Sequence, residues 1–140
     1  MANRGPTLGC QSGPSTDEHF SFLARFGVRH VCASPVGGEP GRLFPTVEEL
    51  SRLREMVERH GLTLAMTDSV LLRSSLIDAE AHPAIMLGES PQRDRDIESF
   101  QQLLRNCAAV GIGTVKYNMS LLGVVRNHVI PGRGGVQYSG

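Results

Sequence analysis

Tryptophan is absent from this 140-residue sequence, and aromatic residues make up only 5% of it. This scarcity argues against surfaces that stack nucleic-acid bases, because such surfaces depend on exposed aromatic side chains. An excess of charge is also missing, since 14 Lys and Arg residues balance 14 Asp and Glu residues. The bulk charge therefore gives no reason to expect a nucleic acid or an anionic membrane as a partner.

Long hydrophobic runs are missing as well. No apolar run approaches the roughly 18 residues that a membrane-spanning helix needs. Residues 1–6 lack the apolar core of a secretory signal peptide. We therefore expect no membrane partner and a cytoplasmic location. The few cysteines are odd in number and lie in apolar stretches, which favours reduced, buried thiols over a disulfide framework: Cys10, Cys32 and Cys107.

Metal-binding patterns are also lacking. No two of the five histidines are three or four residues apart, and no H-E-x-x-H or C-x-x-C motif occurs. The sequence therefore predicts no metal site built wholly within this chain.

What the sequence does contain is one pattern repeated four times: a short apolar run, turn residues, an amphipathic helix and a glycine. The strands that it predicts cover residues 7–11, 30–34, 62–67 and 114–118. Alternation of strand and helix indicates parallel strands joined by right-handed crossovers. Residues 1–140 are expected to form a single α/β domain, in which the turn-rich segment 128–140 is loop or disordered. A doubly wound sheet and a segment of a (β/α)₈ barrel both fit, but no G-x-G-x-x-G motif supports a dinucleotide-binding fold.

Capping signals and apolar faces mark the helices. Glu three residues after Ser15 and after Thr46 predicts the starts of the first two helices, and Ser90 with Pro91 predicts the start of the third. The helical spacing predicts three buried faces, namely Phe22, Leu23 and Phe26; Leu50, Leu53 and Val57; and Ile97, Phe100, Leu104 and Cys107.

Polar residues at the expected carboxyl ends of the strands are candidates for ligand binding, because ligands bind at that edge in both architectures. These residues are Gln11, Ser34, Asp68 and Asn118. Asp68 is a candidate base, ligand or hydrogen-bond acceptor, but it is equally suited to capping the following turn with Ser69.

Two basic residues extend this candidate site. Lys116 lies on the same strand face as Asn118, and a lysine on an inward face can serve as a base or bind an anion. Arg126 has a planar fork of donors that suits a carboxylate or a phosphate.

Several segments together resemble the mannonate dehydratase family, which belongs to the xylose-isomerase-like barrels. The resemblance is strongest in residues 92–98, 104–106, 111–112 and 117–119, and looser in residues 35–37, 68–69, 131–135 and 138–139. It implies a (β/α)₈ TIM barrel truncated to about its first four strand–helix units. It also implies a lyase that dehydrates D-mannonate to 2-keto-3-deoxy-D-gluconate in glucuronate catabolism.

The resemblance implies a divalent metal, Mn²⁺ or Fe²⁺, whose His, Cys and Asp ligands lie in later strands of the family. No metal is therefore expected to bind this chain alone. A small sugar acid is the implied ligand. The substrate-binding residues that we predict from the strand ends and charges described above are Gln11, Ser34, Asp68, Lys116, Asn118 and Arg126. The family tends to have Glu at the position of Asp68, which leaves the identity of the substrate open.

Two alternatives remain at this stage. The chain could belong to a sugar or sugar-phosphate isomerase or epimerase on the same scaffold, because one barrel supports many reactions. It could also be a non-catalytic half-barrel that associates with itself, since the first and fourth strands would each have an unpaired edge. A homo-oligomer is thus one of the expectations.

Overall fold

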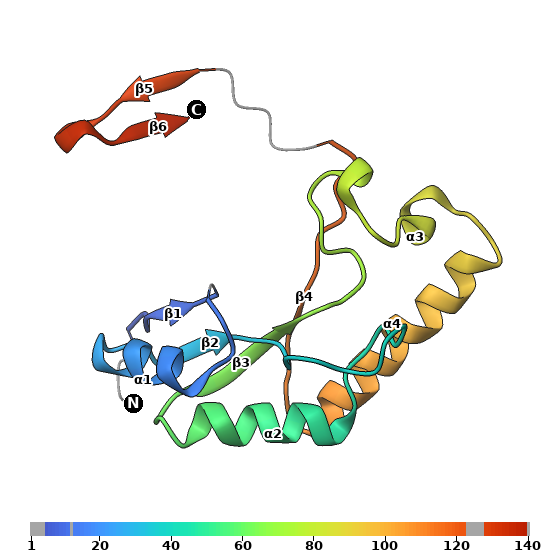
Figure 1. Cartoon of the computed structure of the whole chain (residues 1–140), viewed down its shortest axis with the longest axis horizontal. Helices are drawn as coiled ribbons and strands as arrows, with labels where there is room; N and C mark the ends of the chain where they lie inside the picture. Colours follow the sequence, from blue (N-terminus) through green and yellow to red (C-terminus); the bar gives the residue numbers. More distant parts are fainter. Residues whose placement is uncertain (1–4, 12, 123–127, 140) are drawn as a thin grey trace.

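The computed structural model describes residues 5–11, 13–122 and 128–139, and Figure 1 traces its elements along the chain. The elements follow in the order β1 (Gly9–Cys10), α1 (Asp17–Arg25), β2 (His30–Cys32), α2 (Val47–Glu58), β3 (Thr63–Asp68), η1 (Ile77–Ala79), α3 (Ala84–Leu87), α4 (Gln92–Ala109), β4 (Val115–Lys116), β5 (Val129–Pro131), η2 (Arg133–Gly135) and β6 (Gln137–Ser139).

Strands β1 to β4 form one sheet in sequential order, and each neighbouring pair is parallel. This confirms the α/β class and the alternation of strand and helix, although β1, β2 and β4 are shorter than the sequence predicted. Right-handed crossovers place the connecting helices on the same side of such a sheet. Consistent with this, α1 contacts α2 and α2 contacts α4. The structure therefore has a helical layer over one face of a parallel sheet.

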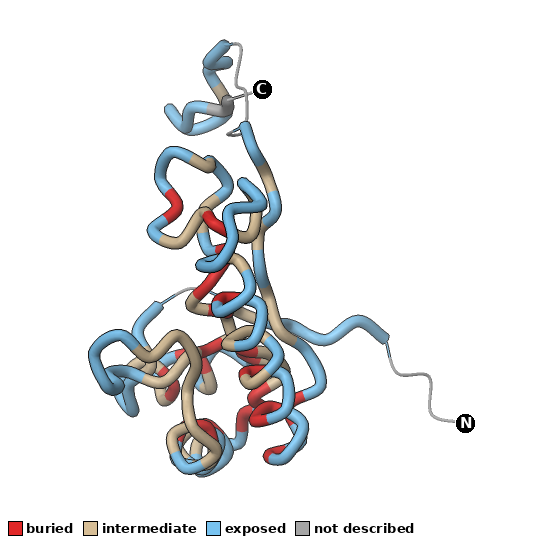
Figure 2. Tube along the Cα trace, turned by 90° about the vertical axis from the view of Figure 1, so that its right-hand side faces the viewer, coloured by how far each residue is buried: buried red, intermediate tan, exposed pale blue. Residues whose placement is uncertain are grey.

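The core lies between this sheet and its helices. Leu50, Leu53 and Val57 of α2 are buried against Val31 and Leu64 of the sheet, which confirms the predicted face of this helix. Full burial of one such side chain contributes about 1.5–3 kcal/mol. Figure 2 shows the buried positions gathered in the part of the molecule that contains the sheet and the helices.

Helix α1 differs from the expectation at its start and on its buried face. Thr16, not Ser15, is the N-cap residue, and its hydroxyl accepts a hydrogen bond from the backbone N–H of His19. The predicted capping box at Ser15 was therefore wrong. Phe20 and Leu23 are the buried residues of the helix.

The predicted face of α1 was wrong for Phe22 and Phe26, which are 47% and 67% exposed. Both rings lie on the outer side of the helix and pack against each other, with centroids 4.7 Å apart. The apolar spacing on this helix fits two faces, and only the docking of the helix on the sheet selects one.

Helix α4 also buries a face other than the predicted stripe. Cys107 is buried as expected, but Ile97 and Leu104 are 38% and 45% exposed, and Leu103 is buried in their place. Ser90 is not the N-cap residue, because its hydroxyl instead hydrogen-bonds a carboxylate oxygen of Asp94.

The buried face of α4 includes polar side chains, which is why apolar spacing misjudged it. Asn106 is 7% exposed, and its Nδ2 donates to the carbonyl oxygen of Pro45 at 2.8 Å. Asp96 is fully buried, and its Oδ1 accepts a hydrogen bond from Gln92 at 2.5 Å. The hydrogen bond of Asn106 offsets much of the cost of its burial, so polarity does not exclude this residue from the core. The second carboxylate oxygen of Asp96, Oδ2, is buried without a hydrogen-bond partner among the described residues.

Strand β3 carries a β-bulge at Ala65. Val31 of β2 is in register with Leu64, but the next residue, Cys32, is in register with Met66. Two residues of β3 thus correspond to one step of β2, and Ala65 is the extra residue. One inserted residue exchanges the faces of all side chains that follow it.

The bulge decides the direction of Asp68. Leu64 and Asp68 would share one face of a regular strand, because they are four residues apart. Leu64 nevertheless belongs to the core, whereas Asp68 lies in register with Lys116 and forms an ion pair with it on the other face. Thr67, which is in register with Val115, is fully buried.

The segment 128–139 is a further difference from the expectation of a loop. Its strands β5 and β6 form an antiparallel pair, in which Ile130 is in register with Tyr138. In the part of the chain that the structure describes, no helix has the length and apolar character to cross a membrane.

Candidate functional site

A cavity of about 190 Å³ lies at the carboxyl ends of β2 and β3. Polar and charged residues that line it include Ser34, Arg42, Glu49, Asp68, Ser69 and Arg73. Small-molecule sites for drug-sized ligands commonly measure about 300–1,000 Å³. The cavity therefore suits a small polar molecule.

Ser34 joins the ends of β2 and β3. Its Oγ accepts a hydrogen bond from the backbone N–H of Asp68 at 3.2 Å and lies 3.2 Å from Oγ1 of Thr67. Its carbonyl oxygen accepts a hydrogen bond from the hydroxyl of Ser15 at 2.7 Å. These bonds hold the strand ends together, so the backbone under Asp68 is well positioned.

Asp68 forms the centre of a polar cluster with groups from the two neighbouring strands. Its Oδ1 lies 3.2 Å from Nζ of Lys116, and it accepts a longer hydrogen bond of 3.7 Å from Sγ of Cys32. The side chains of Asp68 and Lys116 are 30% and 38% exposed. The pair is therefore accessible to a ligand, and Asp68 keeps a second oxygen that can accept hydroxyl hydrogen bonds.

Burial and the charge of Asp68 raise the pKa of the Cys32 thiol to about 11. A thiol with such a pKa is protonated at neutral pH, so it is neither a nucleophile nor a ready metal ligand.

Alkylation of Cys32 should accordingly be slow. Because its pKa is raised from an ordinary value of 9.0 to about 11, we expect iodoacetamide at pH 8 to modify it about 100-fold more slowly in the folded chain than in urea. The exchange Asp68→Asn should accelerate modification of Cys32. Cys107 is the control, since burial alone raises its pKa. Mass spectrometry of quenched samples measures the rates, and equal rates for folded and unfolded Cys32 would contradict the expectation.

Asn118 connects the end of β4 to the loop after β3. Its backbone N–H donates to the carbonyl oxygen of Leu72 at 2.6 Å, and its Nδ2 donates to the carbonyl oxygen of Arg73 at 2.6 Å. A second hollow of about 100 Å³ lies beside this contact, and its lining includes Asp68, Lys116, Asn118 and Arg73. Asn118 thus serves to position the loop.

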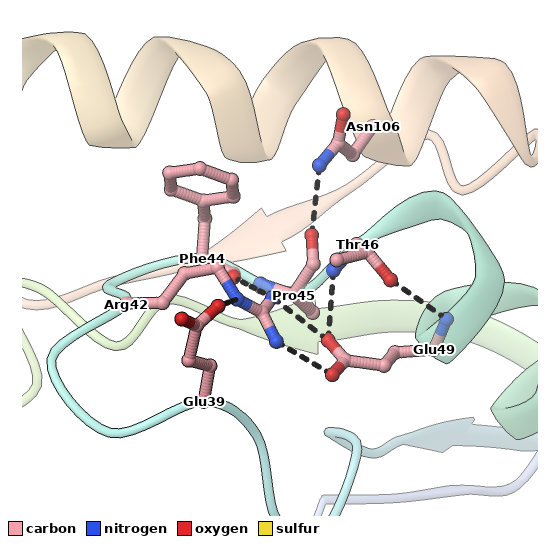
Figure 3. A network of polar contacts seen from close by, with 7 residues as sticks. All are labelled: Glu39, Arg42, Phe44, Pro45, Thr46, Glu49 and Asn106. Carbon is pink, nitrogen blue, oxygen red and sulfur yellow. Dashed lines mark hydrogen bonds and ion pairs between the residues drawn. The ribbon is translucent and has the colours of Figure 1, made fainter.

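A rigid network supports the opposite wall of the 190 Å³ cavity (Figure 3). Both Nη atoms of Arg42 donate to the carboxylate of Glu49, at 2.9 and 2.6 Å, and Nη1 also donates to the carbonyl oxygen of Phe44. Glu49 and Thr46 form the capping box of α2, as the sequence predicted. These contacts neutralise the charge of Arg42, which makes it a structural part of the wall.

One predicted site residue that the structure describes, Gln11, does not line these cavities. It is exposed directly after β1. Arg126 lies outside the described residues. The structure does bring together Ser34, Asp68, Lys116 and Asn118, whose roles in binding stay predictions.

A metal ion does not fit the side chains at this edge. Among the described residues, no group of three His, Cys, Asp or Glu side chains lies close enough together to hold one. The nearest sulfur to Asp68 belongs to Cys32, and its raised pKa keeps it protonated.

Arg73 is the site residue that the sequence reasoning missed. It lies in the loop after β3, five residues beyond Asp68, and lines both hollows. A cation in a long loop that follows a barrel-type strand was the available signal.

Comparisons with known proteins agree with one another. The family described as D-mannonate dehydratase (UxuA) matches residues 19–135. Mannonate dehydratase 2 of Halalkalibacterium halodurans is 35% identical over 107 residues, which cover 76% of this chain and 28% of that protein. Mannonate dehydratase of Thermotoga neapolitana is 40% identical over 92 residues, which cover 66% of this chain and 22% of that protein.

A solved structure shows the same arrangement of elements. The crystal structure of mannonate dehydratase from Streptococcus suis serotype 2 superposes with a TM-score of 0.67 at 23% identity. The match covers 97% of this chain and 37% of that one. The chain thus spans only about a quarter to a third of the length of the proteins that it matches.

Proposed function

Because this chain belongs to the mannonate dehydratase family, we propose that it forms one part of the substrate site of a lyase that dehydrates D-mannonate to 2-keto-3-deoxy-D-gluconate. The proposed architecture is a segment of a (β/α)₈ barrel, in which sites form at the carboxyl ends of the strands. The proposed role in the cell is glucuronate catabolism in the cytoplasm.

One observation carries this proposal: Asp68, Lys116 and Ser34 form a cluster at that strand edge. Asp68 and Ser34 line the cavity of about 190 Å³, and Asp68 and Lys116 line the hollow of about 100 Å³. The free oxygen of Asp68 can accept hydrogen bonds from sugar hydroxyls. The ammonium group of Lys116 is close enough to donate to the same ligand. Both groups are fixed by hydrogen bonds or an ion pair before a ligand arrives, which reduces the entropy lost on binding.

Dehydration of a sugar acid removes the proton next to the carboxylate and expels a hydroxyl group, and a divalent cation such as Mn²⁺ or Fe²⁺ supplies charge stabilisation for the resulting anion. The described residues offer no set of ligands for such an ion. We therefore propose that this chain binds and orients the substrate, and that any metal is held elsewhere in the complete site.

The other two hypotheses find less support. The two relatives and the solved structure named above are mannonate dehydratases, which does not favour an isomerase or epimerase. The same matches do not favour a non-catalytic, self-associating half-barrel. Formation of a homo-oligomer stays a prediction.

A chimaeric enzyme tests the proposal. The 107 matched residues of mannonate dehydratase 2 from Halalkalibacterium halodurans are replaced by those of this chain. We expect the chimaera, supplied with Mn²⁺, to convert D-mannonate to the keto-deoxy acid. In that background Asp68→Asn should lower kcat/KM about 100-fold, since a positioned carboxylate typically contributes that much.

The matched control is Asp78→Asn, which changes an exposed carboxylate of η1 and should leave kcat/KM within about twofold. A folded chimaera that yields no product would refute the proposal. An active chimaera that tolerates Asp68→Asn would remove Asp68 from the site.

A further inference from the structure

Arg73 occupies a shared corner of three adjoining hollows. It lines the cavity of about 190 Å³ beside Ser34, the hollow of about 100 Å³ beside Asn118, and a third hollow of about 350 Å³ beside His82. Asp68 lines the first two of these and not the third. Arg73 therefore forms part of the wall of all three hollows, and a ligand in any of them lies beside it.

The charge of Arg73 is available, unlike that of the other cations at the site. Arg42 is paired with Glu49 at 2.6 Å, and Lys116 is paired with Asp68 at 3.2 Å. Within residues 5–11, 13–122 and 128–139, neither the ion pairs nor the side-chain hydrogen bonds involve the guanidinium of Arg73. An exposed arginine without an anionic partner inside a concave polar surface is suited to bind one from solution.

The backbone at this arginine is held in an unusual conformation. Leu72 has a φ of 56°, which is rare for a residue with a side chain and costs about 1–2 kcal/mol. Asn118 holds residues 72 and 73 through two hydrogen bonds, which its backbone N–H and its Nδ2 donate to the carbonyl oxygens of Leu72 and Arg73. Leu72 is also buried. Strained backbone that is held this firmly is typical of ligand clamps.

We propose that Arg73 is the carboxylate-binding residue of the site and selects acids over neutral sugars. This inference rests on the proposed function. The guanidinium of Arg73 would bind the carboxylate of a six-carbon sugar acid through two parallel N–H···O hydrogen bonds. The hydroxyl chain would then extend toward Asp68 and Ser34, at the neighbouring cavity wall. Lys116 compensates the charge of Asp68, so the carboxylate of the ligand meets little repulsion there.

Binding measurements on the 140-residue chain test this assignment. Nuclear magnetic resonance titrations use D-mannonate as the probe and D-mannose as its neutral counterpart. We expect the chain to bind D-mannonate more tightly than D-mannose. Arg73→Gln should weaken D-mannonate binding about 10–100-fold, as loss of a charged hydrogen-bonding partner typically does. Arg73→Lys should restore part of the affinity, because it keeps the charge without the planar fork.

Arg25→Gln is the matched control, since it removes one exposed charge from the last turn of α1 and should leave binding unchanged. Thermal unfolding of each variant verifies that it folds, and the exposed position of Arg73 predicts an unchanged midpoint. Equal binding of D-mannonate by the chain and by Arg73→Gln would overturn the assignment. So would a chain that binds D-mannonate no better than D-mannose, or not at all.

The chimaera separates failure of this assignment from failure of the proposed function. If the chimaera dehydrates D-mannonate and Arg73→Gln leaves its KM unchanged, the role of Arg73 is refuted and the function stands. If the chimaera is folded but inactive while the chain still binds D-mannonate through Arg73, the function is refuted and the carboxylate site stands.

Discussion

Deletion of Ala65 is expected to lower the free energy of unfolding by more than about 4 kcal/mol, or to prevent folding. Ala65 is the extra residue of the bulge in β3. Without it the strand alternates regularly, and Asp68 shares the face of Leu64, which is buried against the helices. A carboxylate without a partner in that position is strongly destabilising, and the ion pair with Lys116 is lost as well.

Urea unfolding followed by circular dichroism measures this effect. Deletion of Gly38, in the exposed loop after β2, is the control and should shift the midpoint far less. If the cost arises from Asp68 turning into the core, the additional change Asp68→Leu should recover part of the lost stability. A deletion variant that unfolds at the same midpoint as the parent chain would contradict the role of the bulge.

Replacement of Glu49 by alanine should cost about 3 kcal/mol, the second largest effect that we expect. The carboxylate accepts two hydrogen bonds from Arg42 and one from the backbone N–H of Thr46, at 2.8 Å. Its loss breaks the capping box of α2 and leaves Arg42, whose side chain is only 16% exposed, without its main partner. The wall of the cavity would loosen at the same time.

The pH dependence of the unfolding free energy measures the contribution of the Glu49 carboxylate independently. Hydrogen bonds from Arg42, and then the bond from Thr46, lower the pKa of Glu49 from 4.5 to about 2. A lowered pKa means that the stabilisation is complete above pH 4.5 and is lost as the pH falls toward 2. The difference in unfolding free energy between the parent chain and Glu49→Ala should therefore shrink over that range. Glu55→Ala, at an exposed position further along α2, is the control and should change the midpoint little. An equal effect of both variants would count against the network.

Local signals predicted the elements whose causes are themselves local. The capping box at Thr46 and the face formed by Leu50, Leu53 and Val57 depend on residues within about three turns of one helix, and both are confirmed. The same reasoning was wrong for Phe22, because α1 offered more than one apolar face, and for Ile97, because the buried face of α4 includes polar side chains. Which face becomes buried depends on how the helix meets the sheet.

Only the part of the candidate site that follows from local signals was predicted from the sequence. Ser34, Asp68 and Asn118 could be proposed from the rule that sites form where parallel strands end, and the structure brings them to adjoining hollows. Its loop position was the only sequence signal for Arg73, and that signal does not place the residue beside Asp68. The placement depends on Asn118, which is 45 residues away in the sequence.

The sequence by itself determined the repeated strand–helix pattern, the parallel α/β class and the family, because these follow from periodicity, capping residues and a recognisable series of residues. The tertiary structure alone decided that Asp68 faces Lys116 and that Arg73 stands at the corner of the hollows. The physical reason is that both outcomes depend on contacts between distant segments. The bulge at Ala65 arises from the pairing of β3 with β2, and it places the side chains at the end of β3 on the opposite face. The carbonyl oxygens of Leu72 and Arg73 accept hydrogen bonds from Asn118, which follows β4.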